Sequence, residues 1–193
     1  MTTKPTTVKI ASEARRILAR EGADAVTMRR VAQAIGITPM ALYRHYPNRA
    51  GLLNALADEG FDALATQLAG QRYAGDCRQR LFRFLDVYLD FALENPRLFE
   101  LMFLEPREGA RRYPRDFRSG ASPTASIAAS IIRNGMASGE LRSGDPWEIV
   151  FEMGALLQGL IMLHLGGRTS LSAARFRSLC RRSFRRYFDG IRN

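Results

Sequence analysis

The residues best suited to chemistry on a charged partner lie close together near the N-terminus. Hydroxyl, phenol, guanidinium and imidazole groups occur there among small apolar residues: Thr27, Arg29, Thr38, Pro39, Met40, Ala41, Tyr43, Arg44, His45 and Arg49. Such groups contact the phosphate oxygens and base edges of nucleic acid. The sequence holds no H-E-x-x-H, G-x-S-x-G, P-loop or Rossmann motif. We therefore expect a binding protein and no enzyme.

The charge balance favours an anionic partner. The 193 residues include 29 Lys and Arg against 19 Asp and Glu, a formal net charge of +10. Residues 1–50 hold nine basic and three acidic residues, and residues 141–193 hold nine and four. A basic surface attracts nucleic acid first and anionic membrane second.

Other features argue against cofactors, export and a membrane span. Cys77 and Cys180 lie far apart, so the sequence predicts no disulfide framework, no metal site and no cofactor. The N-terminus has no apolar run of signal-peptide length, which favours a cytoplasmic protein. The 15 residues Met153–Gly167 lack charge but are shorter than the roughly 20 residues of a membrane span. We expect them to form a buried helix.

Apolar residues recur at helical spacing along nearly the whole sequence, and strand-like alternation is absent. Glycines and prolines separate the periodic segments. The pattern predicts an all-α fold of about nine helices, near residues 10–21, 28–35, 39–46, 48–71, 78–94, 96–106, 124–138, 146–165 and 172–190. Residues 106–123, rich in arginine and proline, are expected to form a basic, partly irregular connection.

The segment Thr27–Leu53 has the layout of a helix-turn-helix motif. Gly36 permits the turn, and Thr38 is a good N-cap for a helix that begins at Pro39. If Leu42 packs in the core, the helical period turns Met40 and Arg44 outward and brings Tyr46 back toward the core. The outward surface that can enter a DNA groove is then formed by Pro39, Met40, Ala41, Tyr43 and Arg44.

This segment resembles the DNA-binding domain of the tetracycline-repressor (TetR) family over about residues 8–55. The matching residues are Thr27, Val31, Ala32, Gly36, Ile37, Leu42, Tyr43, His45, Tyr46, Arg49, Leu52 and Leu53. The resemblance implies that the ten polar and small residues named first contact DNA, with Arg49 in place of the usual phosphate-binding lysine. It also implies a helix-turn-helix DNA-binding domain over residues 1–52 and a helical ligand-binding and dimerisation domain over residues 53–193.

From the same resemblance we expect a repressor that binds a pseudo-palindromic double-stranded DNA operator as a homodimer. A small, mostly apolar effector would release it. The last two helices would form the dimer interface, with a seam that includes Met153, Leu156, Leu157, Leu160, Ile161, Phe176, Leu179 and Tyr187. The effector pocket would draw on Phe84, Tyr88, Phe91, Met102, Phe103, Met136, Gln158 and Met162.

Several alternatives stay open at this level. His45 suits either a phosphate contact or a role in the domain's own packing, and the seam residues could fill a monomeric core. The arginines of the last helix form either a solvated face or a second DNA-binding site. The chief alternative function is a basic helical protein that binds DNA without sequence preference or binds anionic surfaces.

Overall fold

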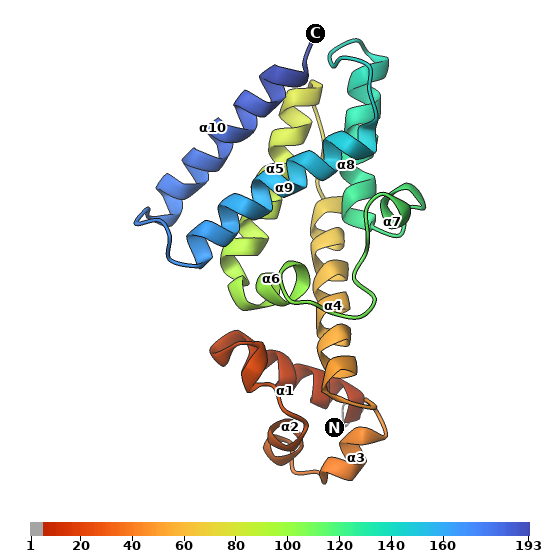
Figure 1. Ribbon diagram of the computed structural model, residues 1–193, viewed down its shortest axis with the longest axis vertical. Coiled ribbons are helices and arrows are strands. Elements are labelled where there is room, and N and C mark those ends of the chain that lie inside the picture. The colour runs from red at the N-terminus through yellow and green to blue at the C-terminus, as the bar shows by residue number, and fades with distance from the viewer. Residues whose placement is uncertain (1–5) are drawn as a thin grey trace. The chain divides into compact units, whose positions relative to one another are not determined.

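A computed structural model describes residues 6–193, and all its regular elements are helices (Figure 1). They are α1 (Thr6–Glu21), the short 3-10 helix η1 (Ala23–Ala25), α2 (Met28–Ala34), α3 (Pro39–Tyr43), α4 (Arg49–Ala69), α5 (Cys77–Glu94), α6 (Pro96–Phe103), α7 (Arg115–Arg118), α8 (Pro123–Ala137), α9 (Pro146–Leu165) and α10 (Ala173–Ile191). Within the described residues no β-strand forms, and the only β-type pairing is an isolated bridge between Leu141 and Arg192. The all-α prediction is confirmed.

The helix boundaries follow the glycines and prolines of the sequence, with differences of three or four residues at the start of α1 and at the ends of α3 and α6. The recognition helix α3 ends at Tyr43 instead of Tyr46, because the backbone tightens into a turn in which the N–H groups of His45 and Tyr46 both donate to the carbonyl of Leu42. The short helix α7 lies in a stretch expected to be partly irregular. Its four residues are too few to show a helical period in the sequence.

The described chain divides into two compact units. The first contains the residues up to Ala63 together with Asn95–Ala110, and the second contains Leu64–Glu94 and Arg111–Asn193. The helix-turn-helix therefore shares its unit with α6, a helix that follows it by about fifty residues in the sequence. The functional boundary expected after residue 52 stays a prediction, because compactness does not test which segment binds DNA.

In the first unit, α6 packs against α1 and α4. Gly60 of α4 allows a close approach, since a Cβ added there would lie 2.6 Å from Sδ of Met102. The rings of Phe61 and Phe103 meet edge to face with centroids 5.1 Å apart. The guanidinium of Arg107 covers the Phe61 ring and lies 3.6 Å from Asp58. These contacts hold α6 on the unit that carries the helix-turn-helix.

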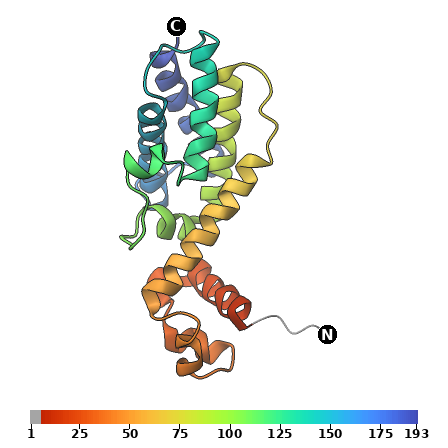
Figure 2. The ribbon, with the colours of Figure 1, turned by 90° about the vertical axis from the view of Figure 1, so that its right-hand side faces the viewer.

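The second unit is built around α5. Its interior residues are almost fully buried: Leu81, Phe84, Leu85, Tyr88, Leu89, Phe91 and Ala92. Helix α8 lies beside α5 (Figure 2), and α10 packs against both α5 and α9. α5 can contact helices on more than one side because its apolar residues are not confined to one stripe.

Helix α9 is not the buried helix that its sequence suggested. Phe151, Met162 and Leu163 are about half exposed, at 45%, 47% and 51%. Only four of its residues are buried in its own chain: Val150, Met153, Leu157 and Ile161. Among the described helices, α9 alone has the length and apolar composition of a membrane span, although interior helices of soluble proteins share these properties. Hydropathy counts apolar residues on every side of a helix, whereas this chain covers only one side.

Gly36, in the turn of the helix-turn-helix, allows a test of how backbone conformation affects the stability of the protein. Gly36 adopts a φ of +72°, and a Cβ there would meet nothing within 4 Å. We expect Gly36→Ala to lower the free energy of unfolding by about 1 kcal/mol, because a left-handed conformation strains any residue with a Cβ. Gly190→Ala, in α10 with ordinary φ and equally open space, is expected to stabilise the protein by about 0.5 kcal/mol. Urea denaturation of both variants checks the pair, and a stabilised Gly36→Ala protein would contradict the argument.

Candidate nucleic-acid interface

The helix-turn-helix is held by a small, fully buried interface between α2 and α3. Val31, Ala32 and Leu42 have no exposed surface. The N–H of Ile37 donates to the carbonyl of Ala32 at 3.0 Å, which closes the turn around Gly36. Because Leu42 points inward, the opposite side of α3 must face solvent.

Two threonine caps begin the two helices. The Oγ1 atom of Thr27 accepts a hydrogen bond from the N–H of Arg30 at 3.2 Å, and Oγ1 of Thr38 accepts from the N–H of Ala41 at 3.2 Å. Each hydroxyl keeps its own proton free to donate, since a hydroxyl is both donor and acceptor. Both side chains are exposed. The caps therefore fix the helix ends and leave a donor for a phosphate oxygen.

The outer face of α3 is exposed as the period predicted. Met40 is 69% exposed and Tyr43 is 46% exposed, with Arg44 exposed directly after them. Tyr46 is half-buried, and burial raises the pKa of its phenol. An apolar thioether, a phenol and a guanidinium are thus presented together, which suits contact with thymine methyl groups and with phosphate or guanine.

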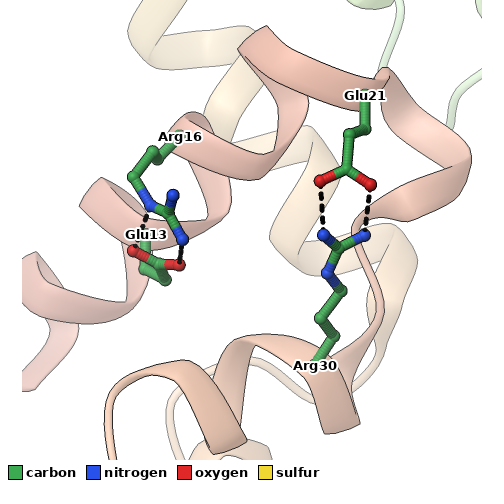
Figure 3. A network of polar contacts seen from close by, with 4 residues as sticks. All are labelled: Glu13, Arg16, Glu21 and Arg30. Atoms are coloured by element: carbon green, nitrogen blue, oxygen red, sulfur yellow. Dashed lines mark hydrogen bonds and ion pairs between the residues drawn. The ribbon is translucent and has the colours of Figure 1, made fainter.

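Two neighbouring arginines of α2 have different surroundings. Arg30 pairs with both carboxylate oxygens of Glu21 on α1, while Arg16 pairs with Glu13 (Figure 3). The hydrogen bond from Arg30 lowers the pKa of the Glu21 carboxyl. Arg29 is exposed and forms no ion pair with any residue that the structure describes. Arg30 is therefore used to tie α2 to α1, whereas Arg29 is free to bind a phosphate.

His45 has a partner that the sequence did not indicate. Its Nδ1 atom lies 3.0 Å from Oγ1 of Thr7, at the start of α1. Both residues are exposed. The two positions are 38 residues apart, so no local pattern could reveal the contact. The contact fixes the orientation of the imidazole ring next to the recognition helix.

Arg49 is occupied by the protein's own backbone. Its Nε donates to the carbonyl of Val26 at 2.8 Å, and its Nη2 donates to the carbonyl of Ala23 at 2.7 Å. The carboxylate of Asp24 lies 3.5 Å away. These contacts connect the first turn of α4 to the loop that precedes α2. A lysine would keep the charge but would offer one nitrogen in place of the two separate nitrogens, Nε and Nη2, that reach these carbonyls.

The structure divides the predicted pocket residues between the two units. Met102 and Phe103 lie in the first unit, where they pack against Gly60 and Phe61. The other six lie in the second unit: Phe84, Tyr88, Phe91, Met136, Gln158 and Met162. Met162 is 47% exposed and the three α5 residues are buried.

One polar pair lies in the apolar interior of the second unit. The amide Nε2 of Gln158 donates to the phenol oxygen of Tyr88 at 3.4 Å, which connects α9 to α5. Tyr88 is 6% exposed, its ring stacks with that of Phe84, and burial raises the pKa of its phenol. A buried phenol and a half-buried amide thus lie next to an aromatic ring, and such groups are typical of pockets for mostly apolar ligands.

The two cysteines are free and buried. Burial raises the pKa of both Cys77 and Cys180 to about 11, so almost no thiolate is present at pH 8. We expect Ellman's reagent at pH 8 to release no colour from the native protein and to detect both thiols after unfolding in guanidinium. A thiol that reacts within minutes in the native protein would contradict this prediction.

Among the described residues no cluster of His, Cys, Asp and Glu could hold a metal ion.

An exposed recognition helix on a capped helix-turn-helix is the arrangement by which DNA-binding proteins enter the major groove. Residues 10–56 match the domain described as "Bacterial regulatory proteins, tetR family", and residues 81–187 match the "Tetracyclin repressor-like, C-terminal domain". The chain belongs to the TetR family of transcriptional regulators. As a member of that family it is a DNA-binding regulator and not an enzyme.

Curated relatives match part of the chain. The nucleoid occlusion factor SlmA of Pasteurella multocida is 32% identical over 97 residues, which are 47% of this chain and 49% of that protein. The chain thus spans about half the length of the curated relatives it matches.

Two solved structures share the whole fold. A protein of unknown function from Rhodococcus sp. RHA1 has a TM-score of 0.79 at 23% identity, over 99% of this chain and 97% of that one. The TetR-family regulator PfmR of Thermus thermophilus has a TM-score of 0.66 at 18% identity, over 94% of this chain and 97% of that one. At these identities the likeness concerns the fold.

Proposed function

We propose that this regulator is a cytoplasmic repressor that binds a pseudo-palindromic operator as a homodimer and dissociates when a small, mostly apolar effector binds. The exposed surface of α3 formed by Met40, Tyr43 and Arg44 carries the proposal. It supplies apolar and charged contacts to base edges, with DNA shape adding to the sequence preference. Around it, phosphates are bound by Thr27, Arg29, Thr38 and His45, with Pro39 and Ala41 close to the groove.

Thr7 acts in this interface by orienting His45. A threonine hydroxyl that donates to Nδ1 leaves the ring proton on Nε2, where it can be donated to a phosphate oxygen. Arg49 acts indirectly, because its guanidinium is used by the carbonyls of Ala23 and Val26. It positions the start of α4 against the loop before α2.

The homodimer follows from the reach of one recognition helix, which covers too few base pairs for a specific site. The uncovered side of α9 offers an apolar surface for a second copy, including Met162 and Leu163. Among the seam residues expected from the sequence, Met153, Leu157, Ile161 and Phe176 are buried in their own chain. The interface is therefore carried by the partly exposed residues Leu156, Leu160, Leu179 and Tyr187 with their exposed neighbours on α9.

The effector site is proposed around Tyr88 and Gln158 in the second unit. Their hydrogen bond is long at 3.4 Å, so a ligand that offers its own acceptor or donor can replace it at small cost. The aromatic residues of α5, Phe84 and Phe91, supply the apolar walls. Met136 completes the set on α8.

The experiment that tests this function is selection of bound sequences from random DNA, followed by fluorescence anisotropy on the selected site. We expect an inverted repeat and a preference of about 1,000-fold or more over unrelated DNA at physiological salt. Binding that ignores sequence and falls steeply with salt would instead identify the basic non-specific protein considered above. Compounds that release the operator from the wild type but not from a Tyr88→Phe, Gln158→Leu variant identify the effector class.

A further inference from the structure

Helices α5 and α10 are antiparallel and joined by ion pairs at regular spacing (Figure 1). Arg177 of α10 pairs with Asp90 of α5, and Arg181 pairs with Asp86. Each partner is one helical turn, four residues, from the next on the same helix. The two pairs therefore set a register in which Arg177 and Arg181 of α10 each meet a carboxylate of α5.

One further turn along, the register no longer supplies a carboxylate. Position 82 on α5 is a phenylalanine, and position 185 on α10 is an arginine. The Phe82 ring lies under two guanidinium groups, those of Arg78 at 5.7 Å and Arg181 at 5.2 Å from its centroid. Among residues 6–193, Arg78 and Arg185 form no ion pair with any carboxylate. Arg78 and Arg185 therefore leave a local excess of positive charge, whereas Arg177 and Arg181 are each paired with an aspartate.

A cleft lies beside these arginines. A cleft of about 490 Å³ is lined by Asp76, Arg78, Gln79, Phe82, Arg83, Asp86, Arg181 and Arg185. The two carboxylates in the lining make other contacts and do not pair with Arg78 or Arg185. Asp76 accepts the N–H of Gln79 at 2.7 Å, and Asp86 is paired with Arg181. Arg83 contacts the amide oxygen of Gln71 and no carboxylate of the described residues.

We propose that this cleft between α5 and α10, which we call the arginine cleft, binds a small molecule with two or more anionic oxygen groups, phosphate or carboxylate. Guanidinium forks suit these groups because both nitrogens of one face donate in parallel. The volume suits a compact ligand. The lining holds four arginines against two aspartates, and its limited volume favours a small ligand over nucleic acid. The lining includes none of the proposed operator contacts and neither Tyr88 nor Gln158.

The test measures anion binding to the full chain with two probes, pyrophosphate for the phosphate source and citrate for the carboxylate source. Calorimetry and thermal melting are run at constant ionic strength, with sodium chloride as the reference salt. We expect at least one probe to raise the melting temperature of the wild type above the chloride reference. Arg78→Gln together with Arg185→Gln is expected to weaken that binding about tenfold or more.

Two matched variants separate the arginine cleft from general positive charge. Arg182→Gln with Arg186→Gln removes two exposed α10 charges outside the cleft lining, and Arg44→Gln removes a charge from the operator interface. Both are expected to bind the probe like the wild type. The proposal is overturned if neither probe exceeds chloride, if the cleft variant binds like the wild type, or if either matched variant loses binding equally. Circular dichroism confirms that each variant is folded.

Discussion

Replacing Tyr43 and Arg44 by alanine together is expected to lower operator affinity by about 100-fold or more. Both side chains are exposed on or directly after α3, while the buried side chain of Leu42 keeps the helix in place. In a two-fold complex each side chain is lost at both half-sites, so the effect is doubled in free energy. Fluorescence anisotropy with the selected operator measures the loss.

The fold of the variant should be unaffected, because neither side chain contributes to the buried interface between α2 and α3. Sedimentation should therefore give the wild-type oligomeric state, and circular dichroism the wild-type helix content. Arg72→Ala, which removes an exposed arginine from the second unit, is the matched control and should bind the operator normally. If the double variant kept wild-type affinity, α3 would not be the recognition helix.

The second large effect is expected at Arg49, because this residue stabilises the domain instead of binding a phosphate. We expect Arg49→Gln to lower the free energy of unfolding by about 1–2 kcal/mol, because it loses two hydrogen bonds to backbone carbonyls. The side chain of Arg49 is 42% exposed, so water replaces part of what is lost. Operator affinity should fall because the loop before α2 is less firmly held, while the salt dependence of binding stays unchanged.

The salt dependence separates the two roles of an arginine. A side chain that neutralises a phosphate contributes about 0.9 to the slope of log affinity against log salt. The side chain of Arg29 forms no ion pair among the described residues. We therefore expect Arg29→Gln to reduce the slope by about 0.9 per phosphate contact and to leave the free energy of unfolding unchanged. Arg49→Lys adds a further check, since it keeps the charge but loses the fork. Wild-type affinity and stability in Arg49→Lys, with a reduced slope in Arg49→Gln, would make Arg49 a phosphate contact.

Much of the helix-turn-helix could be predicted from local sequence because its determinants are local. The caps at Thr27 and Thr38 accept hydrogen bonds from N–H groups three residues later. Gly36 needs only its own backbone freedom, and the inward side chain of Leu42 fixes the outward direction of Met40 by the helical period. The same reasoning missed α7, whose four residues cannot show a period.

Local sequence patterns did not predict which distant residues contact one another. The sequence by itself determined that the chain is helical and basic and that it has an exposed recognition helix. These properties depend on periodicity, capping and charge, which act within a few residues. Only the tertiary structure decided that Arg49 binds carbonyls 23 and 26 residues away, that Thr7 contacts His45, and that α9 stays uncovered on one side. These contacts join distant segments, and their free energy exists only once packing has brought the segments together.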